Sequence, residues 1–387
     1  MAVDVADPRL PVAPNAAARA PLIDLAAESL AAPTASRAAE IDCALASALA
    51  ERLASGQALL LADTLAAAPS VAIARVLWRQ LIDAWALASR PVTGDGVAAV
   101  LFALPVVIVA GSPERADGPQ PPELSARLSD TEKLAAILRE HRALGGNQTF
   151  ALASALVAAD AIEVARLSAL LAWQKLEGGA AAAAHDLPPA PIGVQPGGQS
   201  VHLRFLLGTA LVPAGTDALA ETDLSGWAMP FALELARQLA MPELSVLALP
   251  RRPQTPPSAL QQGRAAQREV GAQLFASNAI RKLRASVGEP SAVISAHRAV
   301  SAPGGGELRL SLSSPFDPRQ AEGFRCPLFP TDRAGDVATM LVDLLRDCRV
   351  TDVRILPGVH ADRDPQTGLT LLFKAEAAAA AEQALLH

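Results

Sequence analysis

A run of sixteen residues without a charge, Gly96 to Gly111 (GVAAVLFALPVVIVAG), constrains the fold more than any other stretch of this chain. A helix needs about 20 apolar residues to cross a bilayer, and this run is shorter and contains Pro105. Its β-branched part, Val106–Val109, favours an interior strand, with the proline at the strand's entrance, where a missing N–H is tolerated. We therefore expect the chain to fold around a buried strand, and a membrane span is the less favoured alternative.

The composition predicts a core of small and aliphatic side chains in a reducing compartment. The 387 residues are 51% hydrophobic but only 3% aromatic, and no tyrosine is present, so tyrosine chemistry is excluded. Cys43, Cys326 and Cys348 form neither a CxxC nor a Cys/His pattern, which argues against a disulfide framework and a zinc cluster. Asp4 and Asp7 replace the cationic start of a secretory leader. We expect a cytoplasmic protein with no metal and no cofactor.

Most of the first half of the chain is expected to be helical. Residues 1–20 are rich in Ala and Pro without a period and are interpreted as a mobile arm. Beyond them, apolar residues recur at spacings of three and four, which predicts helices around 21–89, 130–144 and 149–177. These segments together form a predicted mainly helical domain over 21–177, with the buried strand inside it.

The clearest shift in composition lies at 178–200 (GGAAAAAHDLPPAPIGVQPGGQS), where glycines flank several prolines. Prolines keep such a segment partly extended and semi-rigid. We interpret it as a linker between the helical domain and a second domain over 201–387.

The second domain is expected to mix strands and helices. Alternation in Val201–Leu207 and the short apolar run Leu244–Leu249 predict two strands, with a helix at Met229–Ala240 between them. A long helix is expected over Ala259–Val287. Strong amphipathic periodicity predicts another helix over Val337–Cys348.

Two β-hairpins are expected in the same domain. One pairs Ser291–Val300 with Glu307–Leu312 around the turn SAPGGG, and the other pairs Val350–Leu356 with Leu369–Phe373. Ala375–Leu386 predicts a terminal helix. The expected fold class is α/β or α+β, with a mainly helical N-terminal half and a mixed α/β C-terminal domain that contains two hairpins.

The sequence holds no recognisable catalytic motif. It has neither a GxSxG elbow nor HExxH, and the GGG run at 304–306 precedes a predicted strand instead of the helix that a phosphate loop requires. His360, Asp362 and Asp364 lie within five residues and are weak candidates for an acid–base or metal-assisted site. The same segment carries Asp-Pro followed by Gly, so a hairpin turn is the favoured interpretation.

Two histidines lie on predicted strands. His202 and His297 neighbour Arg204 and Arg298, and we interpret both as parts of an exposed strand face. The remaining histidines are scattered. The motifs therefore do not decide whether the protein is an enzyme.

The strongest electrostatic feature is a basic segment over 251–284. It holds seven basic residues against Glu269 alone, in a chain whose formal net charge is -6. Arginine forms charge-assisted hydrogen bonds with phosphates and carboxylates, so the segment is a candidate anion-binding surface. It contains one aromatic residue, Phe275, which is not enough to form a base-stacking channel. Ion pairing with acidic residues of the same chain is the favoured alternative. The candidate anion-binding residues are Arg251, Arg252, Arg264, Arg268, Arg281, Lys282 and Arg284.

These observations favour a non-catalytic interaction or assembly subunit of a larger complex. Apolar helices with few charges are expected at 151–159 and 169–172, and such helices commonly bury a further face in oligomers. A protein partner or a homo-oligomer is therefore predicted, nucleic acid is a less favoured partner, and no membrane association is expected. The alternatives are an enzyme with an acid–base or metal site assembled in the C-terminal domain, and an anion or nucleic-acid accessory protein that uses the basic segment.

Overall fold

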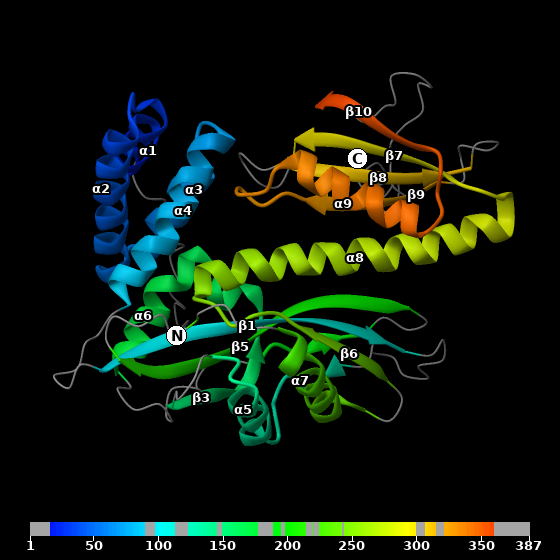
Figure 1. The fold of residues 1–387 in the computed structure, drawn as a ribbon, viewed down its shortest axis with the longest axis horizontal. Coiled ribbons are helices and arrows are strands. Elements are labelled where there is room, and N and C mark those ends of the chain that lie inside the picture. Colours follow the sequence, from blue (N-terminus) through cyan, green and yellow to red (C-terminus); the bar gives the residue numbers. More distant parts are fainter. Residues whose placement is uncertain are drawn as a thin grey trace, which may run out of the picture.

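The protein combines two four-stranded β-sheets with helices, which confirms the expected mixed α/β class (Figure 1). Four helices come first, and sheets with interleaved helices follow. None of the helices in the part of the chain described below is long and apolar enough to cross a membrane. The computed structural model describes residues 16–89, 97–112, 123–144, 149–176, 189–194, 198–213, 219, 224–241, 244–298, 306–314 and 321–359.

The N-terminal helices form where the sequence places apolar stripes between good capping residues. Thr34 and Ser70 accept hydrogen bonds from the N–H groups of Arg37 and Ile73, which satisfies free donors at two helix starts. The predicted helical region is thereby confirmed over most of its length. The helices are α1 (Ala16–Ala31), α2 (Ala35–Ala54), α3 (Ala58–Ala66) and α4 (Val71–Ala88).

The first sheet is built around the apolar run and has the strand order β3-β5-β1-β6, with every pair antiparallel. Residues 101–111 of β1 are all buried, so the predicted interior strand is confirmed. Pro105 lies inside the strand instead of at its entrance, opposite Phe205, and its carbonyl accepts a bond from the Arg251 N–H. The strands are β1 (Val97–Gly111), β3 (Thr149–Val157), β5 (Gln199–Pro213) and β6 (Ser245–Pro250).

The helix predicted over 149–177 is wrong in its first half. Residues 149–157 form β3, which pairs with β5, and only Leu167–Leu176 is α-helical, as α6, after two short 3₁₀ turns. Pairing with a strand some 50 residues away overrides the local helix preference of Ala and Leu. The argument that apolar helices at 151–159 bury a further face therefore does not hold for that segment.

The proline-rich segment 178–200 does not divide the chain into two parts that pack separately. It precedes β5, yet β5 lies between β1 and β3 of the first sheet. A short strand inside the segment, β4 (Ile192–Gly193), pairs with β2 (Glu123–Leu124) of the predicted helical domain. Helices α5 (Thr131–Glu140) and α7 (Leu224–Leu239) belong to the same half of the molecule and contact each other.

The second sheet has the order β10-β7-β8-β9. Strands β7 (Ser291–Arg298) and β8 (Gly306–Ser313) form the first predicted hairpin, which is confirmed. β9 (Ala321–Pro327), which the sequence did not predict, adds to β8, and β10 (Val353–Val359) runs parallel to β7. The predicted amphipathic helix is confirmed as α9 (Ala334–Asp347). The partner expected for β10 at 369–373, the terminal helix at 375–386 and residues 1–15 of the N-terminal arm lie outside the described residues.

One helix connects the two sheets. α8 (Pro256–Val287) has 32 residues, so it is about 48 Å long. Its first half packs on β1 and β5, where Gly263 leaves room for Leu203 and Phe205, and its second half packs under β8, β9 and α9. The two hydrophobic cores therefore divide along this helix, which lies between the two sheets in Figure 1.

Candidate functional site

A cavity of about 670 Å³ lies along α8 where the two sheets approach each other; we call it the α8 cavity. β5 contributes its first residues, and β9 and the segment after it form the other wall. The contributing positions of α8 are three or four residues apart, which places them on one helix face about 21 Å long. These α8 positions are Arg264, Gln267, Arg268, Gly271, Leu274, Phe275 and Asn278.

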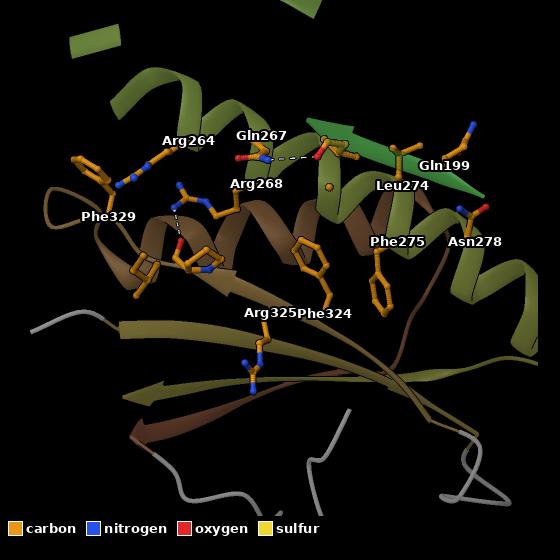
Figure 2. A pocket seen from close by; sticks show the side chains of 14 residues that line it. Gln199, Arg264, Gln267, Arg268, Leu274, Phe275, Asn278, Phe324, Arg325 and Phe329 are labelled. Carbon is orange, nitrogen blue, oxygen red and sulfur yellow. Dashed lines mark hydrogen bonds between the residues drawn. The ribbon is translucent and has the colours of Figure 1, made fainter. Parts of the chain in front are cut away.

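One end of the cavity is polar (Figure 2). Arg268, whose side chain is 9% exposed, donates to the Asp332 carboxylate and, at 3.0 Å, to the Pro327 carbonyl. Its Nε–H is buried and has no hydrogen-bond partner among the described residues. Arg264 pairs with Glu163, and its guanidinium carbon lies 5.6 Å from the centre of the Phe329 ring. This end therefore presents guanidinium groups. Their positive charges are offset by carboxylates of the same chain.

Asp332 holds the polar end in place. Its carboxylate accepts from Arg268 and, at 2.6 Å, from the Phe329 N–H, while its carbonyl accepts from Arg75 of α4 at 3.1 Å. Its side chain is only 14% exposed. Helix α4, helix α8 and the segment before α9 thus meet at one residue, which the sequence predicts only as a possible start of the helix that follows.

The middle of the cavity is apolar. The rings of Phe275 and Phe324 stack with centroids 5.5 Å apart and an interplanar angle of 25°, and Leu274 and Val201 continue the surface. Gly271 lets this wall approach α8, because a Cβ there would lie 3.3 Å from the Phe324 ring. Figure 2 shows the two phenylalanines between the arginines at one end and the amides at the other.

The far end carries side-chain amides. Asn278 and Gln199 lie there, and the Asn278 oxygen accepts a bond from Arg281 at 2.8 Å, which leaves the amide N–H groups for other acceptors. Gln267, nearer the arginines, donates to the Val201 carbonyl at 3.4 Å. The α8 cavity therefore runs from guanidinium groups through an apolar centre to amides.

A second cavity of about 470 Å³ lies on another face of α8, towards α9. Its surroundings are charged: Arg251 and Glu269 approach within 3.5 Å, and the Arg268–Asp332 pair borders it as well. Arg268 therefore contributes to both cavities, and its ion pair separates them.

The structure does not gather the seven predicted anion-binding residues at one site. Only Arg264 and Arg268 line the α8 cavity. Arg251 and Arg252 precede α8, and the other three lie near its C-terminal end. Contacts within the chain are made by Arg251 with Glu269, Arg264 with Glu163, Arg268 with Asp332, Arg281 with Asn278, Lys282 with Glu322, and Arg284 with Glu289.

The predicted acid–base candidates His360, Asp362 and Asp364 lie outside the described residues. Within the described ranges, no group of three or more His, Cys, Asp and Glu residues is arranged to hold a metal ion.

The interpretation of His297 as part of an exposed strand face is wrong. The residue is 4% exposed, and its Nε2 lies 2.7 Å from the hydroxyl of Ser295, which is 1% exposed. Glu307 and Arg309, on the neighbouring strand, are also buried and bond to each other at 2.7 Å. Polar residues two apart on one strand share a face, so they satisfy each other there. The buried serine hydroxyl is not placed to meet a substrate.

His202 makes the same kind of contact, with its Nε2 2.9 Å from the Ser200 hydroxyl. Burial, and then the nearby positive charge of Arg204, lower the pKa of His202 below its usual value of 6.5. Arg204 itself holds the carbonyls of Ala190 and Pro191. The group anchors the segment 189–194 against β5 and is structural.

The sequence signals only part of the α8 cavity. The spacing of Arg264, Arg268 and Phe275 along a predicted helix could have identified one shared face. Asp332, Phe324 and Gln199 come from other elements, and no local pattern marks them. Comparison of the chain with protein-family models, curated proteins and solved structures finds no match. A function must therefore be argued from the site itself.

Proposed function

We propose that the protein is a non-catalytic binding subunit of a larger assembly and that the α8 cavity is its recognition site. The chemistry of the lining carries this proposal. The lining side chains, as described, are arginine, glutamine, asparagine, glycine, proline, valine, leucine and phenylalanine. Serine, threonine, cysteine, histidine, lysine and the carboxylic acids, which supply nucleophiles and general acids or bases, are not among them. Such a surface can hold a ligand but offers no group for proton transfer or covalent attack.

The size and polarity of the α8 cavity support binding. Ligand sites commonly enclose about 300–1,000 Å³ and are mainly apolar, with a few placed polar groups. The α8 cavity has this character, with its phenylalanines at the centre and its hydrogen-bonding groups at the ends. The cytoplasm remains the compartment we propose, which the exposed free thiol of Cys43 supports.

The anion-binding alternative loses support from the ion pairs. Five of the seven candidate residues pair with carboxylates of the same chain, so an external anion must compete with a covalently tethered one. Arg264 and Arg268, which α8 contributes to the α8 cavity, are among these five; the third lining arginine, Arg325 of β9, was not a candidate.

The proposal is tested by placing a charge in the α8 cavity and measuring assembly. Leu274→Asp puts a carboxylate into the apolar centre, and Gln273→Asp puts the same charge on the neighbouring exposed position outside the lining. Tagged full-length chains isolated from the source cells are compared by size-exclusion chromatography with light scattering. We expect the wild type and Gln273→Asp in a particle heavier than the 39.9 kDa chain, and Leu274→Asp at the mass of the chain alone.

A second variant separates loss of binding from loss of folding. Asn278→Trp changes an exposed side chain and obstructs the far end of the cavity without removing an apolar contact. We expect it to release the assembly while its thermal unfolding midpoint stays within a few degrees of the wild type. Assembly that persists in both cavity variants, or a wild type that is isolated as the free chain, contradicts the proposal.

A further inference from the structure

The α8 cavity has the length of a short extended peptide. Its α8 face runs from Arg264 to Asn278, about 21 Å. An extended chain rises about 3.3 Å per residue, so about six residues span this distance. A volume of about 670 Å³ spread over that length gives a narrow site, which favours a single chain over a folded surface.

The order of groups along the cavity matches the polarity of a peptide. Arg264, Arg268 and Gln267 lie towards one end and Gln199 and Asn278 at the other. The centre between them is mainly apolar, with Arg325 next to Phe324. A peptide offers carbonyl and N–H groups along its whole length and can place one apolar side chain at its middle. A hydrocarbon chain offers no acceptor to the donors at either end.

The charges around the α8 cavity favour an uncharged segment. Of the three lining arginines, Arg264 and Arg268 already pair with Glu163 and Asp332, and the Arg268–Asp332 pair is largely buried. An anionic ligand at Arg268 would have to break that pair and leave Asp332 without its counter-ion. A neutral carbonyl oxygen can instead accept from arginine N–H groups while the pair remains. Arg264, whose side chain is 41% exposed, can present such N–H donors at this end.

We infer that the α8 cavity binds an extended, uncharged segment of a partner protein, about six residues long, whose central apolar side chain packs against Phe275 and Phe324. This inference rests on the proposed function and names its ligand. Backbone carbonyls of the segment accept from the arginine end, and the amides of Gln199 and Asn278 bond its other end.

Selection from a library of random hexapeptides tests the inference. The library is displayed on phage and selected against the full-length protein, and enriched peptides are synthesised with acetyl and amide ends and a fluorophore. Fluorescence anisotropy then gives their affinity. We expect enriched peptides to share Leu, Ile, Met or Phe at a central position without a neighbouring charge. Replacing that residue by Asp weakens binding at least tenfold.

The protein variants locate the peptide. Leu274→Asp is expected to weaken binding at least tenfold, and Gln273→Asp to leave it within twofold. Because the segment is uncharged, its affinity changes less than threefold between 50 and 500 mM salt. The inference is overturned if no peptide is enriched above a selection without protein, if enriched peptides are acidic, or if Leu274→Asp binds them as the wild type does.

Failure of the peptide-binding inference can be distinguished from failure of the proposed function. If assembly depends on Leu274 but no peptide is enriched, the ligand class is wrong and the recognition site stands. Titration with oleate in the same format shows whether a lipid chain takes the site instead, and Leu274-dependent oleate binding without peptide binding overturns the inference.

Discussion

At the scale of single residues, Asp332 has the largest structural role near the α8 cavity. It pairs with Arg268 and accepts from the Phe329 N–H through its carboxylate, and its carbonyl holds Arg75. Replacing Asp332 by Ala leaves the guanidinium of Arg268, 9% exposed, without a counter-ion. Breaking a buried pair in this way costs about 3–5 kcal/mol, so we expect a loss of that size in the free energy of unfolding measured with urea.

A surface pair provides the matched control for Asp332. Asp343 bonds Arg346 at 3.1 Å, but their side chains are 61% and 71% exposed. Solvent screens such a pair, so Asp343→Ala should lower the free energy of unfolding by less than about 1 kcal/mol. Equal effects of the two substitutions would show that the Asp332 interactions are not stabilising in the folded protein.

His202 makes the free energy of unfolding depend on pH. Its pKa in the folded protein is lowered by burial and by Arg204, so below pH 6.5 the unfolded chain binds the proton more readily than the folded one. The free energy of unfolding should therefore fall as the pH drops from 7 to 5. His202→Asn should flatten the curve in this window, and His141→Asn, at an exposed histidine, should not. A curve that rises towards pH 5, or that is unchanged in His202→Asn, contradicts the assignment.

At the scale of elements, the first sheet depends on a close approach between β5 and β1. Gly208 lies opposite Phe102, and a Cβ at this position would be 2.3 Å from the ring and 2.9 Å from the Ala151 carbonyl oxygen. Overpacking of this kind costs about 1–3 kcal/mol. We expect Gly208→Ala to lower the free energy of unfolding by that amount. Gly193→Ala, where nothing lies within 4 Å of the added Cβ, should change it by less than about 1 kcal/mol.

The elements also show what the sequence can and cannot predict. The helix predicted over 259–287 is present as α8, which begins three residues earlier with prolines at its first positions, where no helix N–H bond is lost. A helix is predicted where β3 forms, because its partner β5 is distant in the sequence and its Ala and Leu residues suit either structure. β9 has no strong alternation and is held by β8, so it could not be predicted at all.

The candidate site, too, combines local features that the sequence signals with long-range contacts that it does not. Its α8 face is a local feature, and the arginines on it were already predicted to bind or to pair. The second sheet brings Phe324 to the α8 cavity, and the segment before α9 brings Asp332 to Arg268 beside it, from about 50–60 residues further along the chain. The ion pairs that offset the arginines are also long-range, so charge counting alone overstated the attraction for anions.

At the scale of the whole molecule, α8 belongs to both hydrophobic cores. Ala259, Leu260 and Val270 lie in the first core, and Ala276 and Leu283 in the second. A helix shared in this way should make the two cores unfold together, because losing either one leaves half of α8 without its packing. The chain carries natural reporters for each core, which makes this coupling measurable.

All four tryptophans precede α8 in the sequence, and Trp78, Trp85 and Trp227 are buried in the first core. Cys326 is fully buried in the second core, where burial raises the pKa of its thiol to about 12. Native Cys326 should therefore resist alkylation at pH 8, while the exposed Cys43 reacts. Cys326 becomes reactive only when the second core opens.

We expect tryptophan fluorescence and Cys326 alkylation, read by peptide mass spectrometry, to give coincident urea transitions in the wild type. Gln273→Pro removes a helix hydrogen bond at an exposed position between the two sets of core residues and should cost about 3 kcal/mol or more locally. In that variant Cys326 should react at lower urea than the concentration that shifts the tryptophan signal, whereas Gln273→Ala keeps the two transitions together. Separate transitions in the wild type would mean that the cores are independent and that α8 does not couple them.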